Sequence, residues 1–97
     1  MAEALQSDKR IEAIIIGYSN GFTAYHDVKM IRLKGDHLNL LIMADYMPTV
    51  GEIHGTVELV REDGFGGEIV PLRDVSGFFV VKNNVFKLLL EEDNNVC

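Results

Sequence analysis

Apolar and polar residues alternate along most of this chain, with the two-residue period of half-buried strands. Residues 37–42, His-Leu-Asn-Leu-Leu-Ile, are a clear example, and residues 56–61 repeat the pattern. Further runs rich in β-branched and aromatic residues lie at 11–16, 22–25, 28–33, 68–73, 78–81 and 85–90. Turn residues separate these runs about every 8–12 positions, as in antiparallel sandwiches and barrels. The pattern predicts an all-β fold, although residues 86–92 also have helix propensity.

Proline and glycine interrupt the alternation between its two clearest strands. Pro48 halts ladder pairing there, because proline has no N–H to donate. Gly51 and Gly55 are expected to bracket a bend that follows it. Tyr46 and Met47 occupy the apex of this predicted loop. Two large amphipathic side chains on irregular backbone either form a contact surface or cap the core, and spacing alone favours the cap.

Other turn signals divide the remaining runs. The pair Asn20-Gly21 and residues 82–84, Lys-Asn-Asn, predict hairpin turns. Adjacent apolar residues at Met30 and the next position predict a bulge, and Pro71 predicts an edge strand or a bulge. The glycine-rich residues 62–67 are interpreted as a hairpin loop, because a phosphate cradle would need a following helix with Lys and Ser or Thr.

Length and charge limit the classes of function. The 97 residues suit one domain at 11–93, with a peripheral leader at 1–10 and a tail at 94–97. A formal net charge of −6 argues against nucleic-acid binding, which needs clustered Lys and Arg. No apolar run approaches the roughly 20 residues that span a bilayer, and no signal-peptide pattern is present, so a cytoplasmic location is expected. Cys97, the single cysteine, cannot form an internal disulfide.

The candidate catalytic residues do not form a recognisable constellation. Imidazole and carboxylate side chains that suit a divalent metal occur at His26, His37 and His54 and at Asp27, Asp36 and Glu52. The histidines are widely spaced and each is near a turn, so a small barrel metalloenzyme is the less favoured alternative. No serine lies in a nucleophile-elbow pattern, and the carboxylate runs at 62–63 and 91–93 read as solvated strand ends. The sequence favours a binding or structural role with no cofactor.

Four stretches occur in the order of a known family. They are residues 27–35, 38–48, 56–64 and 75–84, the last followed by the run 85–91. In this order and spacing, the chain resembles the N-terminal β-sandwich domain of the epsilon subunit of F-type ATP synthases, over about residues 11–93. The resemblance therefore implies an antiparallel β-sandwich of short strands.

Several positions depart from the family pattern. Asp45 stands where the family has a glycine, Tyr46 replaces a histidine and Met47 an alanine, and Phe78 replaces one glycine of a serine-glycine-glycine motif. The family's acidic residue at the preceding strand falls on Asn39. The chain ends at Cys97, before the helical hairpin that family members usually carry. The expectation is a short form without that autoinhibitory arm.

The resemblance implies a rotor role in the central stalk. The subunit would link the gamma shaft to the c-ring and couple ion-driven rotation to ATP synthesis or hydrolysis, without being catalytic itself. It would lie in the cytoplasm on the inner face of the cell membrane, attached only through the complex. The residues implied at the interface with the c-ring or gamma are Asp36, Asn39, Asp45, Tyr46, Met47 and Pro48. The alternative is a stand-alone β-sandwich that binds a protein or peptide.

Overall fold

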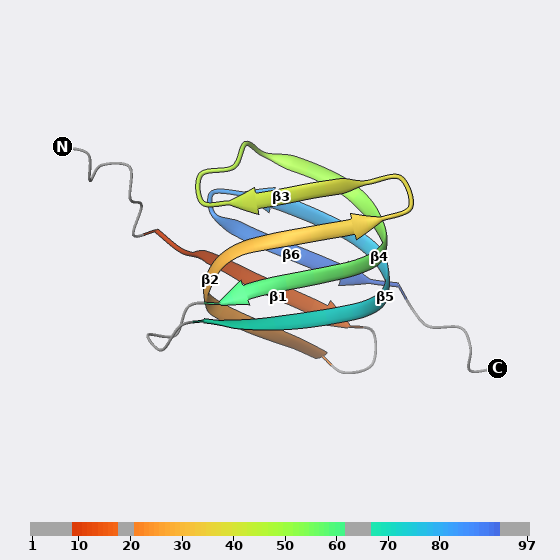
Figure 1. Cartoon of the computed structure of the whole chain (residues 1–97), viewed down its shortest axis with the longest axis horizontal. Helices are drawn as coiled ribbons and strands as arrows, with labels where there is room; N and C mark the ends of the chain where they lie inside the picture. Colours follow the sequence, from red (N-terminus) through yellow and green to blue (C-terminus); the bar gives the residue numbers. More distant parts are fainter. Residues whose placement is uncertain (1–8, 18–20, 62–66, 92–97) are drawn as a thin grey trace.

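The computed structural model describes residues 9–17, 21–61 and 67–91, and these ranges contain strands and turns but no helix. The strands are β1 (Ile11–Gly17), β2 (Gly21–Gly35), β3 (Asn39–Met43), β4 (Thr49–Arg61), β5 (Glu68–Lys82) and β6 (Val85–Leu90) (Figure 1). The all-β prediction is confirmed. Residues 86–90, which belong to the run with helix propensity, form a strand because they pair with both β1 and β5.

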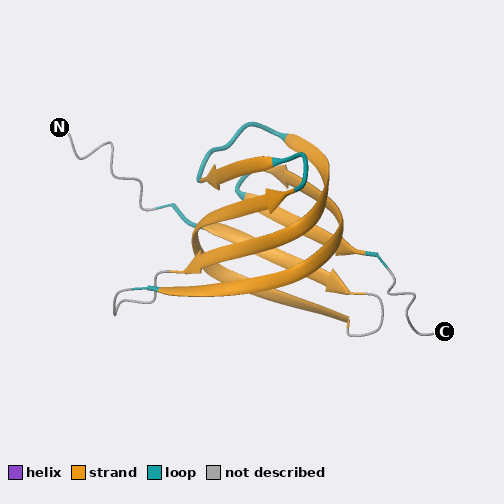
Figure 2. Cartoon of the chain, turned by 45° about the vertical axis from the view of Figure 1, so that its right-hand side comes forward, coloured by secondary structure: helices purple, strands orange, loops and turns teal. Residues whose placement is uncertain are grey.

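The sheet closes on itself into a barrel. Its strand order is β1-β6-β5-β4-β2, and β1 pairs again with β2, so that five strands form a ring and β3 lies beside β2 (Figure 2). Neighbouring strands are antiparallel except β1 and β6, which run parallel. The expected sandwich of two separate sheets is not confirmed. The physical reason is that the long strands curve around one core, so that each covers more than one side of it.

Strands β2 and β5 are the two longest strands, and both are curved. The first half of β2 pairs with β1, and its second half pairs with β3 and β4. The sequence predicted separate strands at 22–25 and 28–33, but the two are continuous. The register against β4 shifts between Val28 and Met30, so that Val28 and Ile31 are both buried. The predicted bulge is therefore present, just before the expected place.

Strand β4 corrects the prediction of a long loop. The connection after β3 ends at Pro48, and Gly51 and Gly55 lie inside β4 rather than in a bend. A Cβ on Gly51 would lie 2.8 Å from the ring of Phe79, and one on Gly55 would lie 2.1 Å from the carbonyl oxygen of Lys34. Because glycine has no side chain, the neighbouring ring and backbone can lie close to this curled strand.

A turn follows β2, and the predicted turn after β5 is confirmed. The backbone N–H of Gly35 donates to the carbonyl oxygen of Leu38, at 2.7 Å. Asn83 and Asn84 both have positive φ, 53° and 63°, as a two-residue hairpin turn requires. Pro71 lies in the half of β5 that pairs only with β4, so the edge-strand alternative holds; the register shift comes later in β5, between Leu72 and Val75.

Some sequence predictions fall outside the described residues. The turn at 18–20 and the glycine-rich loop at 62–66 are among them, although the strands on either side of each are antiparallel. Residues 1–8 of the predicted leader and the whole predicted tail at 94–97 also lie outside, as do 92 and 93.

Inward side chains form a single apolar core inside the ring. The rings of Phe79 and Phe86 stack within it, with centroids 6.0 Å apart. Complete burial of one such side chain stabilises the fold by about 1.5–3 kcal/mol. None of the buried residues that the structure describes is polar or charged. The core consists of Ile11, Ala13, Ile15, Val28, Ile31, Leu33, Ile42, Ile53, Val57, Leu59, Val75, Phe79, Val81, Phe86 and Leu88.

Candidate functional site

The six residues predicted at an interface lie at the two ends of β3. Asp36 belongs to the turn before this strand and Asn39 begins it, whereas residues 45–48 follow it. Five residues of strand extend over about 15 Å, at about 3.3 Å per residue. The structure therefore does not gather the six into one spot. It places two of them at the start of β3 and four beyond its end.

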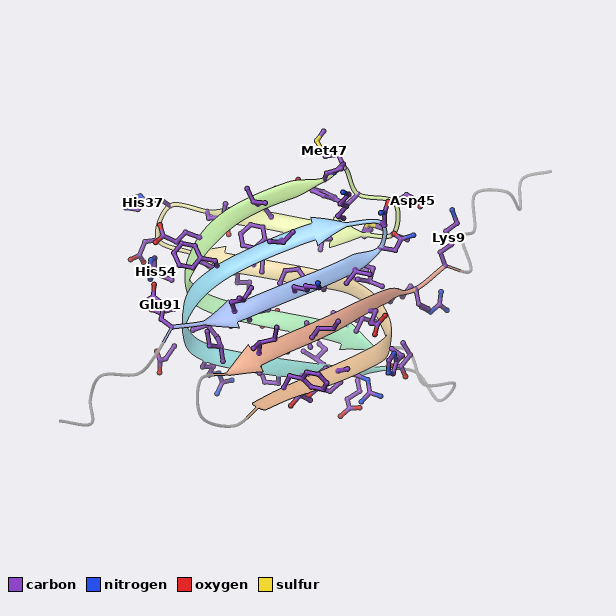
Figure 3. All side chains as sticks on the ribbon, turned by 180° about the vertical axis from the view of Figure 1, so that it is seen from behind. Lys9, His37, Asp45, Met47, His54 and Glu91 are labelled. Atoms are coloured by element: carbon purple, nitrogen blue, oxygen red, sulfur yellow. The ribbon has the colours of Figure 1, made fainter. Side chains whose placement is uncertain are left out.

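Asp45 is engaged within the chain. Its carboxylate accepts hydrogen bonds from Lys9 Nζ, at 3.2 Å to each oxygen, and from Asn84 Nδ2, at 3.2 Å. The backbone N–H of Asp45 donates to the side-chain oxygen of Asn84. The backbone carbonyl oxygen of Asn84 in turn accepts a hydrogen bond from the N–H of Glu12, at 3.0 Å. These contacts join the loop after β3 to the β5–β6 turn and the start of β1 (Figure 3).

The same contacts explain the acidity and backbone of Asp45. The hydrogen bond from Asn84, followed by that from Lys9, lowers the pKa of the Asp45 carboxyl below its ordinary value. The residue also has a φ of 65°, a left-handed conformation that aspartate and asparagine tolerate better than most residues. This carboxylate therefore has an ammonium and an amide as partners within the chain.

Tyr46 and Met47 differ in exposure. The Tyr46 side chain is partly buried and packs against the core. Met47 is 67% exposed and points away from the barrel (Figure 3). Tyr46 thus fits the capping interpretation, and Met47 remains available for a partner.

A first apolar surface crosses the outside of β3, β2, β4 and β5. Cross-strand pairing places Met43 beside Met30, Met30 beside Val60, and Val60 beside Ile69. Met43 and Ile69, at the two ends of this row, are 49% and 59% exposed. Leu41, the outward residue two positions before Met43, extends the surface. We call these five residues the front face, because the β2, β3 and β4 strands are nearest the viewer in Figure 1.

Charged side chains flank the front face on two sides. On one side, Glu58 lies 3.6 Å from Arg32 Nη1 and 3.9 Å from Lys34 Nζ. On the other side, Arg61 makes two contacts with the carboxylate of Asp27, of 2.9 and 3.2 Å. An apolar centre within a charged surround is the arrangement of many protein–protein contacts.

A second apolar surface lies on the opposite side, outside β1, β6 and β5. One row runs from Phe78 through Leu89 and Ile16 to Phe22. The adjacent row contains Val50, Val80 and Ile14, with Lys87 between the last two. We call this set the rear face, because β1 and β6 lie behind the front strands in Figure 1. Its members are Ile14, Ile16, Phe22, Val50, Phe78, Val80 and Leu89.

The two faces account for nearly all the exposed apolar area of the described residues. Apart from Met47, each exposed large apolar side chain described by the structure belongs to one face or the other. Isolated exposed apolar residues need no explanation, but contiguous patches on a small protein commonly mark contacts. The sequence carried one signal for the front face. Leu41 and Met43 are apolar at the outward phase of β3, which indicates a strand covered on both sides.

The three histidines do not converge. His26 Nδ1 lies 3.4 Å from Glu12, whereas His37 and His54 line a pocket of about 250 Å³ at the other end of β2. His54 Nδ1 is 3.0 Å from Ser76 Oγ, and its Nε2 is 3.6 Å from Glu52. Within ranges 9–17, 21–61 and 67–91, no three His, Cys, Asp or Glu side chains are grouped to hold a metal ion.

Comparison with known proteins leaves the fold and the two faces as the basis for function. No protein-family model matches the chain, and no curated protein matches it significantly. The described residues contain no helix long and apolar enough to cross a membrane.

Proposed function

We propose that this chain is a non-catalytic module that binds a protein partner through its front face. The observation that carries the proposal is the row of Met43, Met30, Val60 and Ile69, which crosses four strands and has charged side chains on both sides. Partly exposed methionines suit such a contact, because their flexible side chains adapt to another surface. The paired strands of the barrel hold the backbone of this row in place, so binding does not have to order the backbone, and this favours affinity.

The resemblance to the epsilon subunit supplies a specific form of this proposal. In that form the chain is a rotor subunit of an F-type ATP synthase, and its partners are the gamma subunit and the c-ring. The order of the four sequence stretches supports it. Asp36, Asn39 and Met47 surround the front face and would lie at the edge of the contact. The closed barrel differs from the family's sandwich, so this form depends on sequence order alone.

The test is binding to the gamma–c-ring assembly purified from the organism that supplies this chain. We expect saturable binding of the native chain, measured by biolayer interferometry in detergent. Met43→Ser and Ile69→Ser should each raise Kd about tenfold or more, the scale of a hot-spot truncation. Phe78→Ser, a comparable change on the rear face, is the matched control and should leave Kd unchanged.

Two outcomes would count against the proposal at different levels. Absence of saturable binding by the native chain would remove the rotor form. The general form is then tested in cells with a photo-crosslinking residue at Leu41 and, as a control, at the exposed Arg73. One discrete adduct at Leu41 that is lost in Met43→Ser supports a front-face partner. No adduct at Leu41, or the same adduct at both positions, would refute it.

A further inference from the structure

Strand β3 has an open edge, opposite the side on which it pairs with β2. It is the last strand in the order of the sheet, and no other described strand pairs with it. A strand in this position carries backbone N–H and C=O groups without ladder partners, and these groups can pair with another extended chain.

The turn between β2 and β3 shows which residues of β3 point their backbone groups to the open edge. The N–H of Gly35 donates to the carbonyl oxygen of Leu38 across this turn, so these two residues form a bonded pair. Bonded and non-bonded pairs alternate in antiparallel strands, so residues 40 and 42 bond to β2 and their neighbours point away from it. Those neighbours are Asn39, Leu41 and Met43. The backbone groups of Asn39 and Leu41 have no partner among the described residues.

Strand β3 lacks the features that usually keep an edge unpaired. Natural proteins protect open edges with charged residues, prolines or bulges. The other strand segments that pair on one side only each contain a charged residue: 21–27 of β2, 49–54 of β4 and 68–72 of β5. Residues 39–43, Asn-Leu-Leu-Ile-Met, contain no charge, proline or glycine, and their register against β2 has no shift.

We propose that the open edge of β3 binds an extended segment of the partner protein, which pairs with β3 as an added strand. The inference rests on the proposed front-face function and specifies the form in which the partner binds. The backbone groups of the edge select this occupant. They recur every two residues, about 6.7 Å, and an extended chain presents N–H and C=O groups at the same spacing. The formal net charge of −6 makes two copies of the chain repel each other, so the segment belongs to another protein.

The edge also specifies side chains of the segment, because directly opposed residues of paired strands project on the same face of the sheet. A residue opposite Met43 extends the row of Met30, Val60 and Ile69 by one strand. A residue opposite Leu41 covers that side chain, which is 46% exposed. The segment therefore carries apolar residues at two positions separated by one residue.

The charges beside the edge do not demand a charged segment. Arg32 and Lys34, which pair with Leu41 and Asn39, share the carboxylate of Glu58, at 3.6 and 3.9 Å. Asp36 lies in the turn before β3, and beyond the strand Asp45 is paired with Lys9. Positive and negative charges around β3 are thus balanced, so backbone groups and apolar side chains determine binding.

The first test is amide hydrogen exchange of the purified chain, followed by NMR. In the isolated monomer, the N–H of Leu41 should exchange much faster than those of Leu40 and Ile42, which are bonded to β2. A slow Leu41 N–H in the monomer would show that the edge is already covered, and it would overturn the proposal. Protection of Leu41 that appears together with a dimer in sedimentation velocity would show that a second copy is the occupant, which also overturns it.

The probe for the segment is a library of random peptides displayed on phage and selected on the native chain. We expect the enriched peptides to carry apolar residues at alternate positions. A synthetic copy of the most enriched peptide should bind saturably and protect the Leu41 N–H from exchange. A selection that gives no such peptide would overturn the proposal.

Variants at Leu41 separate its backbone group from its side chain. Leu41→Pro removes the N–H and keeps an apolar side chain, at an edge position where proline is tolerated. Replacement of Leu41 by its α-hydroxy acid, with an ester oxygen in place of N–H, makes the same change and keeps the native side chain. Each should raise the peptide Kd about tenfold or more, with unchanged circular dichroism, because an acceptor of the segment loses its donor. Leu41→Ser, which keeps the N–H, should raise Kd less, and Phe78→Ser on the rear face should not change it.

The same variants distinguish strand addition from the front-face function on which it rests. A Kd that rises in Met43→Ser but in neither backbone variant would mean that the segment binds the face without adding a strand. That result would refute strand addition and leave the front-face function standing. A Kd that rises in the backbone variants alone would support strand addition and count against the front face.

Discussion

At the scale of single residues, Arg61 is the side chain on which three strands converge. It ends β4, contacts Asp27 of β2 through two nitrogens, and lies 3.3 Å from Glu68 at the start of β5. Its guanidinium also stacks over the Tyr25 ring, 5.2 Å from the centroid. The hydrogen bond from Arg61 is the main reason that the pKa of Asp27 is lowered and that of Arg61 is raised. Two hydrogen bonds from a planar guanidinium to one carboxylate fix the relative orientation of the two side chains as well as pairing their charges.

This pair predicts how stability depends on pH. A carboxyl whose pKa is lower in the folded chain contributes its full stabilisation above its unfolded pKa, near 3.8. That contribution is lost as the pH falls through the lower folded value. We expect Asp27→Asn to reduce the stability at neutral pH and to flatten the loss of stability on acidification, in urea-unfolding titrations. Asp36→Asn, on an exposed turn, is the control. Parallel curves for native chain and D27N would contradict the prediction.

At the scale of elements, β5 and β6 approach so closely that glycine is required at position 77. A Cβ on Gly77 would lie 2.2 Å from the carbonyl oxygen of Leu89, and backbone cannot move aside easily. We expect Gly77→Ala to lower the free energy of unfolding by about 1–3 kcal/mol, the usual cost of overpacking. Gly35→Ala is the comparison and should cost less, because its Cβ would lie 3.0 Å from Cδ1 of Ile53 and 3.1 Å from the carbonyl oxygen of His54, so a smaller shift relieves it. Equal losses in the two variants, measured by urea unfolding, would argue against this account.

The elements also show what the sequence could reveal. Alternation located most strand segments, though not residues 49–55 of β4, and the asparagines located the β5–β6 turn, because both signals are local. Closure of the ring was not predictable, since Gly51 and Gly55 suit a bend as well as a curled strand. Of the predicted contact residues, Met47 is exposed, whereas Tyr46 packs on the core and Asp45 is bonded to Asn84. The front-face row depends on the register of four strands, which no single stretch of sequence contains.

At the scale of the whole molecule, the two apolar faces lie on opposite sides of one rigid barrel. A partner that binds the front face therefore leaves the rear face uncovered.

The parallel pairing of β1 with β6 also determines when the chain can fold. Glu12 pairs with Val85 and Ile16 with Leu89, so the ring is joined by segments from nearly opposite ends of the sequence. During synthesis β1 has β2 as its neighbour, but its second edge stays open until β6 has left the ribosome. Such distant pairings slow folding, because the entropy of closing the long intervening segment is lost before the contacts form. In this interval, the nascent chain exposes an isoleucine-rich strand edge to which chaperones or other nascent chains can bind.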